Sequence, residues 1–193
     1  MNGRTDLVES FNALPQRIFL DSSTLQALQD YGELIYENIE PPPGDRVYAI
    51  PGGYEELDAL RAVFFVNRRA LFEFALSKNS FEEVAAKGDQ AYLQWAYDVL
   101  DHWEACLAAY RGSPFSGEGE ATPSCLNDPP FGYLSAKDRL LLQDALVLEC
   151  DAFLTIDRKL VKNAKHLLAR TGIEVLLLSK FWEILQPWAR LFV

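Results

Sequence analysis

The sequence predicts an α/β fold built on a mostly parallel sheet. Two observations predict it: four short apolar segments bounded by polar or turn residues, and helical patterns between them. Strands that are covered on both faces are hydrophobic almost throughout, as these segments are. The chain has 193 residues, of which 49% are hydrophobic, so it can bury one sizeable core, and we expect a single domain.

The predicted strands are 17–20, 72–76, 152–155 and 174–178. Helices are predicted between them, over 22–37, where serine and threonine provide capping groups, and over 54–66, after a Pro-Gly-Gly break. A short helix is expected to begin at Asn79 or Ser80 and to run through residue 86.

The clearest helical pattern is 89–110, where large apolar residues recur at three- and four-residue spacing. We expect that stripe to pack into the core. Two stretches rich in proline and glycine, around 40–54 and 112–130, are predicted to be loop insertions. The apolar run 181–193 is expected to close the core; the alternative is a self-association surface that would form a homodimer.

The composition argues against disulfide-rich, zinc-binding, secreted and membrane-spanning proteins. Three widely spaced cysteines and no CxxC pair argue against a disulfide framework or a structural zinc site. The first ten residues lack the apolar region of a signal peptide, and no run of 18 apolar residues occurs, so we expect a cytoplasmic protein with no membrane partner. The net charge of −10 disfavours nucleic-acid binding unless basic residues cluster locally.

Acidic residues are predicted to gather at one edge of the sheet, because ligands of parallel α/β sheets bind outside the carboxyl ends of the strands. Asp21 directly follows the first strand and Asp157 lies two residues beyond the third. Glu83 follows Ser77 by six residues, near the start of the helix that leaves the second strand. Asp138 begins the helix that runs antiparallel into the third strand, so it lies at the same edge.

The same geometry ranks nearby acids lower. Asp144 lies six residues beyond Asp138, roughly 9 Å further along the helix. Asp151 begins the third strand, at the opposite edge of the sheet. Glu82 points about 100° away from Glu83 on a helix.

Four crowded carboxylates repel one another unless cations neutralise them, and hard oxygen donors suit Mg²⁺ or Mn²⁺. Such ions activate water and stabilise charge on a phosphodiester. Thr155 and Ser23 could support the carboxylates through hydroxyl hydrogen bonds. The sequence therefore predicts a divalent-metal site, and four unrelated surface acids are the alternative.

This pattern resembles the PIN-domain family of metal-dependent ribonucleases, which includes toxin subunits of toxin–antitoxin pairs. The matching motifs are a hydrophobic strand ending in Asp21, Ser77 followed six residues later by Glu83, and an Asp138-led helix that runs into a strand ending Thr155-x-Asp157. A Gly-Ile-x-Val run opens the last strand, as in the family. The resemblance implies a three-layer α/β/α sandwich with four to five strands in its sheet.

The resemblance also implies a function. It assigns metal coordination to Asp21, Asp138 and Asp157, coordination or water orientation to Glu83, and phosphodiester hydrolysis of RNA as the reaction. The family often has asparagine where this chain has Ser23, and the span from Asp21 to Glu83 is longer than in compact toxins. These departures argue against a minimal toxin. The partners that the resemblance implies are RNA and an antitoxin or another protein.

Basic residues that could contact RNA phosphates follow Asp157 directly: Arg158, Lys159, Lys162 and Lys165. A solvated helix face is the alternative. His166 is expected to lie on a helix surface and not to act as a base. Two rival functions stay open: a non-catalytic PIN-like module that binds RNA or protein, and a phosphatase, although Ser23 stands where a haloacid-dehalogenase-type phosphatase would carry a second aspartate.

Overall fold

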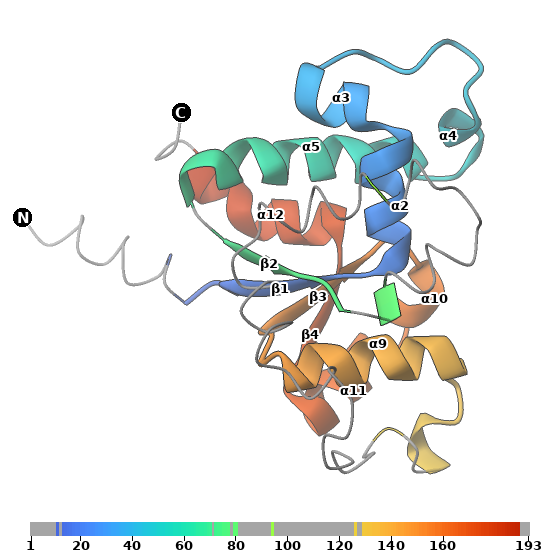
Figure 1. The fold of residues 1–193 in the computed structure, drawn as a ribbon, viewed down its shortest axis with the longest axis vertical. Coiled ribbons are helices and arrows are strands. Elements are labelled where there is room, and N and C mark those ends of the chain that lie inside the picture. Colours follow the sequence, from blue (N-terminus) through green and yellow to red (C-terminus); the bar gives the residue numbers. More distant parts are fainter. Residues whose placement is uncertain are drawn as a thin grey trace, which may run out of the picture.

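The computed structural model describes residues 11, 13–70, 72–77, 79, 80, 94, 126 and 129–189, without the side chain at position 69. Glu83, the helix predicted over 89–110 except residue 94, and nearly all of the loop predicted over 112–130 lie outside the described residues. The described part is an α/β structure with a four-stranded, all-parallel sheet in the order β2-β1-β3-β4 (Figure 1). The α/β class and the parallel sheet are thus confirmed.

All four predicted strands form. β1 is Arg17–Leu20, β2 is Glu73–Ala75, β3 is Ala152–Thr155 and β4 is Glu174–Leu177. β1 pairs with both β2 and β3, with Ile18 opposite Phe74 on one side and Ala152 on the other. β1 and β3 are fully buried apart from Arg17, as expected for strands covered on both faces.

Two strands are shorter than predicted, for local reasons. Phe72 is excluded from β2, and its N–H binds the side-chain oxygen of Asn67 at 2.6 Å. β4 ends before Leu178, where the next helix begins. Glu56 accepts hydrogen bonds from the N–H and the hydroxyl of Ser179, at 2.9 and 2.7 Å, and so satisfies a backbone donor in the first turn of that helix.

Helices cover the sheet on both sides (Figure 1). α5 (Gly53–Ala70) and α12 (Leu178–Ala189) pack against each other on one side. α9 (Ala136–Val147) and α11 (Ala164–Thr171) lie on the other, with the single turn α10 (Arg158–Val161) between β3 and α11. η3 (Pro129–Phe131) precedes α9.

The prediction of one helix over 22–37 is wrong, because two helices form there. α2 (Ser22–Asp30) ends at Tyr31, and α3 (Gly32–Glu37) follows. The hydroxyl of Tyr31 donates to Asp45 at 2.9 Å, which ties the break to the segment beyond α3. That segment, predicted to be a loop, contains the one-turn helix α4 (Arg46–Ala49), whose first turn is capped by the Asp45 carboxylate through the N–H of Val47.

The core lies between the sheet and its covering helices. Phe19 and Phe153 stack with ring centroids 5.3 Å apart, and Phe74 of β2 stacks on Phe64 of α5 at 4.8 Å. Phe181 and Leu185 of α12 are completely buried, which confirms that this part of the carboxy-terminal run closes the core. Self-association stays a prediction. None of the described helices is both long and apolar enough to cross a membrane.

Candidate functional site

Asp21 lies where β1 ends and α2 begins, and its side chain is 7% exposed. Its Oδ2 accepts hydrogen bonds from the hydroxyls of Ser23, at 2.6 Å, and Thr155, at 2.7 Å. Its N–H binds the carbonyl of Leu154 in the neighbouring strand at 3.0 Å, so the end of β1 is fixed against the end of β3. The carboxylate is therefore held in one orientation by one side chain of α2 and one of β3.

Thr155 connects Asp21 to Asp157. Its hydroxyl donates to Asp21 and accepts the N–H of Asp157 at 2.9 Å. Asp157 in turn caps α10, because its Oδ1 accepts the N–H of Lys159 at 2.7 Å. One hydroxyl of the Thr-x-Asp motif thus holds the carboxylate of Asp21 and the backbone of Asp157, which gives the supporting role predicted for Thr155 a geometric basis.

Asp138 lies in the first turn of α9, within a reciprocal capping box. Its N–H binds the Ser135 hydroxyl at 3.1 Å, and its Oδ2 accepts the N–H of Ser135 at 3.1 Å. This box was missed in the sequence, although Ser135-x-x-Asp138 is its usual signature. It fixes the helix start and the direction of the Asp138 carboxylate together.

A cavity of about 330 Å³ brings Asp138 and Asp157 together. Ser135, Lys159 and Tyr133 contribute to its walls as well. The second oxygens of Asp138 and Asp157 accept no hydrogen bond from any residue that the structure describes. Two of the predicted carboxylates therefore line one cavity, and the third is joined to Asp157 through Thr155.

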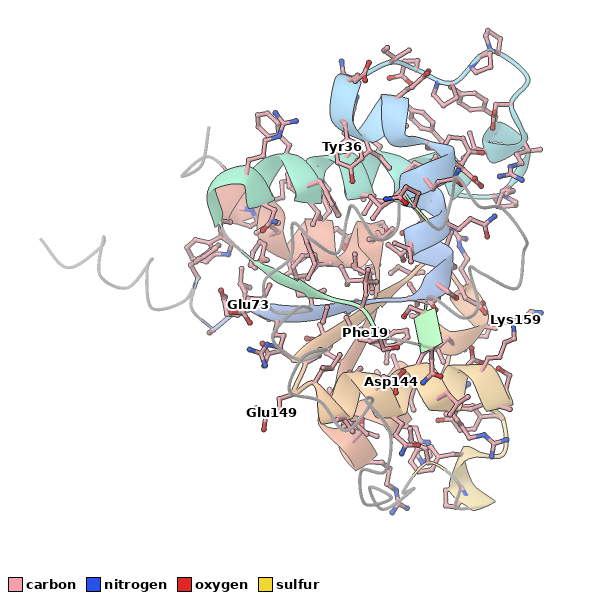
Figure 2. All side chains as sticks on the ribbon, viewed as in Figure 1. Phe19, Tyr36, Glu73, Asp144, Glu149 and Lys159 are labelled. Carbon is pink, nitrogen blue, oxygen red and sulfur yellow. The ribbon has the colours of Figure 1, made fainter. Side chains whose placement is uncertain are left out.

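Asp144 is placed differently from these acids. It is 3% exposed, and its Oδ2 accepts hydrogen bonds from the hydroxyl of Ser77, at 2.5 Å, and the amide of Asn79, at 2.8 Å. Figure 2 shows it projecting from α9 toward the sheet. Its bonds anchor the segment that leaves β2, so it positions the chain that leads to Glu83. Sequence reasoning did not identify this role.

Asp151 lies at the opposite edge of the sheet, as expected. Its Oδ2 accepts the N–H groups of Gln16 and Arg17, both at 2.9 Å, beside the start of β1. Figure 2 shows the two edges of the sheet on opposite sides of the view: Glu73 and Glu149 lie at the edge where the strands begin, and Lys159 lies at the carboxyl edge. The candidate site is therefore confined to the carboxyl edge.

The candidate ligands only partly match a metal site. Within the described ranges, no three His, Cys, Asp or Glu side chains stand close enough to hold one. The fourth predicted ligand, Glu83, is not among the described residues. The chemistry of the donors does fit a hard cation. Asp138 and Asp157 line one cavity, and each has a carboxylate oxygen that is not used in its helix-capping hydrogen bond.

The predicted phosphate contacts divide into two groups. Lys159 lines the cavity of Asp138 and Asp157, whereas Arg158 lines a second cavity beside Ser23. Lys162 and Lys165 are exposed and line neither. His166 is half-buried on α11, and its Nδ1 lies 2.9 Å from the hydroxyl of Tyr133. Partial burial raises the pKa of the Tyr133 hydroxyl above its ordinary value.

Comparison of the chain with protein-family models, with curated proteins and with solved structures gives no match.

Proposed function

We propose that this chain is a PIN-like, Mg²⁺- or Mn²⁺-dependent endoribonuclease, with a three-layer α/β/α architecture. Asp21, Asp138 and Asp157 would coordinate the metal, and Glu83 would complete the site or orient the attacking water. A bound metal ion would supply activation of water and stabilisation of charge on the phosphodiester. The chain's own residues would hold the carboxylates in place and bind the RNA backbone.

One observation carries the proposal: Asp138 and Asp157, from different elements, line a single cavity at the carboxyl end of β3. Both are also used as helix caps, so their backbone positions are fixed before any ligand binds. Preorganised ligands lower the reorganisation needed for binding.

Support for Asp21 comes from its hydrogen bonds. A carboxylate that is 7% exposed needs compensation, and the hydroxyls of Ser23 and Thr155 provide it in part. Ser23 here takes the place where relatives of the resembled family often carry asparagine, and its 2.6 Å bond to Asp21 supplies a similar orienting contact.

The RNA grip rests on Lys159 at the cavity and Arg158 beside it. Both are exposed cations next to Asp157, so a phosphate approaching the carboxylates would meet positive charge. Lys162 and Lys165 would extend this positively charged surface along the bound RNA. These cations offset, locally, the overall net charge of −10.

The decisive experiment compares cleavage of single-stranded RNA by the wild type, Asp157→Asn and Asp151→Asn, with Mn²⁺ and with EDTA. Asparagine caps helices as well as aspartate does, so Asp157→Asn should keep α10 while removing the ligand charge. We expect at least a hundredfold loss of cleavage in Asp157→Asn and none in Asp151→Asn. Equal loss in both variants, or cleavage that persists in EDTA, would contradict the proposal.

A second candidate function is a non-catalytic module that binds RNA or a protein partner. The observation that favours it is the lack of a three-ligand cluster among the residues that the structure describes. RNA binding that survives EDTA, together with no cleavage by the wild type, would decide for this candidate. In that case Lys159→Ala should weaken binding and flatten its salt dependence, whereas Lys180→Ala, on α12, should not.

A further inference from the structure

A second cavity, of about 520 Å³, adjoins the candidate site. Its size falls within the range of about 300–1,000 Å³ typical of small-molecule pockets. α2, α4, the first turn of α5 and the residues after β3 form its walls, and Figure 1 shows α2, α4 and α10 on the same side of the molecule. The predicted insertion around 40–54 therefore builds one wall of this cavity.

The walls are apolar, with polar groups at separate points. Ala27, Val47, Leu57 and Ile156 line it, and the ring of Tyr31 offers an aromatic surface. Gln26 contributes an amide, which can both donate and accept hydrogen bonds. A flat, partly polar ligand suits such a lining better than a hydrated ion does.

Four charged side chains line the cavity, and three of them already have polar partners. Arg46 pairs with Asp30, and Glu56 is bound by Ser179. Arg158 forms no ion pair with any residue in the described part of the chain. The cavity therefore presents one cationic group for an anion.

Gly52 makes room for that guanidinium. A Cβ built on Gly52 would lie 1.8 Å from Nη2 of Arg158, so the group occupies the space over the glycine. The φ angle of Gly52 is +70°, which only glycine adopts without strain. Glu55, whose carboxylate lies 3.4 Å from the same Cβ position, faces this point as well. The insertion thus both forms the wall and admits Arg158.

The cavity is continuous with the candidate site, and this position indicates the ligand. Ser23 lines the cavity and also donates to Asp21, while Arg158 directly follows Asp157. We propose that this cavity is a nucleotide subsite: it takes the base of a nucleotide next to the bond that is cleaved, with the phosphate of that nucleotide on Arg158. This inference rests on the proposed function, yet the subsite can be tested without cleavage or metal.

The test is binding of AMP, GMP, CMP and UMP to the full chain in EDTA, followed by NMR chemical shifts, with ribose 5-phosphate as the ligand without a base. Gln26→Trp fills the cavity, and Gln29→Trp is its control, because Gln29 is half-buried on the same helix but does not line the cavity. Arg158→Gln removes the cation, and Arg170→Gln, at the end of α11, is its control.

We expect at least one nucleotide to shift Ile50, Gly52 and Gly53 and to bind at least tenfold more tightly than ribose 5-phosphate. Gln26→Trp and Arg158→Gln should each weaken binding tenfold or more, and the two controls should not. Equal binding of ribose 5-phosphate, no nucleotide binding at all, or undiminished binding to Gln26→Trp would each overturn the subsite.

The two proposals can fail separately. Nucleotide binding that depends on Gln26 and Arg158, in a chain that cleaves no RNA, would keep the subsite and remove the nuclease. Metal-dependent cleavage with no nucleotide binding to the cavity would keep the nuclease and remove the subsite.

Discussion

Asp144 accepts a hydrogen bond from Ser77 across 67 positions of sequence, and this bond joins α9 to the segment that leaves β2. Asn79 adds a second bond to the same oxygen, and Asp144 is almost completely buried. The geometry gives Asp144 a positioning role: it holds the start of the segment in which Glu83 lies.

We expect Asp144→Ala to lower the free energy of unfolding by about 1–3 kcal/mol, because buried donors at Ser77 and Asn79 lose their acceptor. Urea unfolding measures this. Leu140→Ala is the control, since Leu140 is exposed on the same helix and should change stability by less than about 0.5 kcal/mol. Similar midpoints for the two variants would show that the buried carboxylate contributes little.

Thr155→Val should affect both stability and metal binding. The change keeps the side chain's shape but removes the hydroxyl that donates to Asp21 and accepts from Asp157, at a cost of about 1–2 kcal/mol. Calorimetry with Mn²⁺ should show weaker binding as well.

Thr171→Val provides a control, because the Thr171 hydroxyl likewise donates one hydrogen bond, here to the carbonyl of Leu167, and accepts one from a backbone N–H, that of Ile173. It should lose similar stability while binding Mn²⁺ as the wild type does. A metal affinity that is unchanged in Thr155→Val would remove Thr155 from the site.

Divalent metal should stabilise the wild type against heat. Binding to the native state adds about 2.7 kcal/mol at a hundredfold excess over Kd, so the melting temperature should rise between EDTA and millimolar Mn²⁺. The rise should vanish in Asp138→Asn, whose capping side chain is largely conserved, and should persist in Asp151→Asn. A melting temperature that Mn²⁺ leaves unchanged in the wild type argues for the non-catalytic candidate.

Gly52→Ala should destabilise the chain more than Gly44→Ala does. Both glycines have positive φ, of +70° and +92°, so both variants carry a backbone penalty of about 1–2 kcal/mol. Only at position 52 would the new Cβ collide with Arg158, whereas nothing lies within 4 Å at position 44. Thermal unfolding of both variants measures the difference, and equal losses would mean that Arg158 moves aside freely.

Acid should weaken the wall formed by α4. The N–H of Val47, and then the hydroxyl of Tyr31, hold the pKa of Asp45 below its ordinary value. Because folding lowers this pKa, the Asp45 carboxylate stabilises the folded chain at higher pH, and its contribution is lost as the pH falls through the lowered value.

An NMR titration of the Asp45 carboxyl carbon tests this directly. Its midpoint should lie below about 3.9, the value for model peptides, and Tyr31→Phe should raise it part of the way. Tyr48→Phe is the control, because the Tyr48 hydroxyl binds the carbonyl of Pro41 instead. A midpoint that Tyr31→Phe does not move would show that the Tyr31 hydroxyl does not contribute to the lowered pKa.

The strands could be predicted from the sequence because buried parallel strands are apolar throughout. β1 and β3 agree with their predicted bounds residue by residue. The break at Tyr31 could not be predicted, because it is tied to Asp45, 14 positions away, which no helical periodicity encodes. The ends of β2 and β4 were set likewise by side chains of other elements, Asn67 and Glu56.

The site was predictable in part. Topology placed Asp21, Asp138 and Asp157 at one edge, because the ends of parallel strands and the starts of the helices feeding them coincide. The capping box at Ser135 had a readable signature. The buried role of Asp144 had none, since its partners Ser77 and Asn79 are brought to it only by the pairing of β2 with β1. Whether Glu83 joins the other acids stays a prediction.

The pairing of β1 also governs when the site can form during synthesis. Asp21 and Thr155 are separated by 134 positions, and β1 lies in the sheet between β2 and β3. Ribosomes add about 5–20 residues per second, so Asp21 waits several seconds or more for the strand that orients it. The carboxylate of Asp21 therefore lacks its hydrogen bond from Thr155 while the nascent chain is short of β3, and this edge of the sheet is completed only after β3 has emerged from the ribosome.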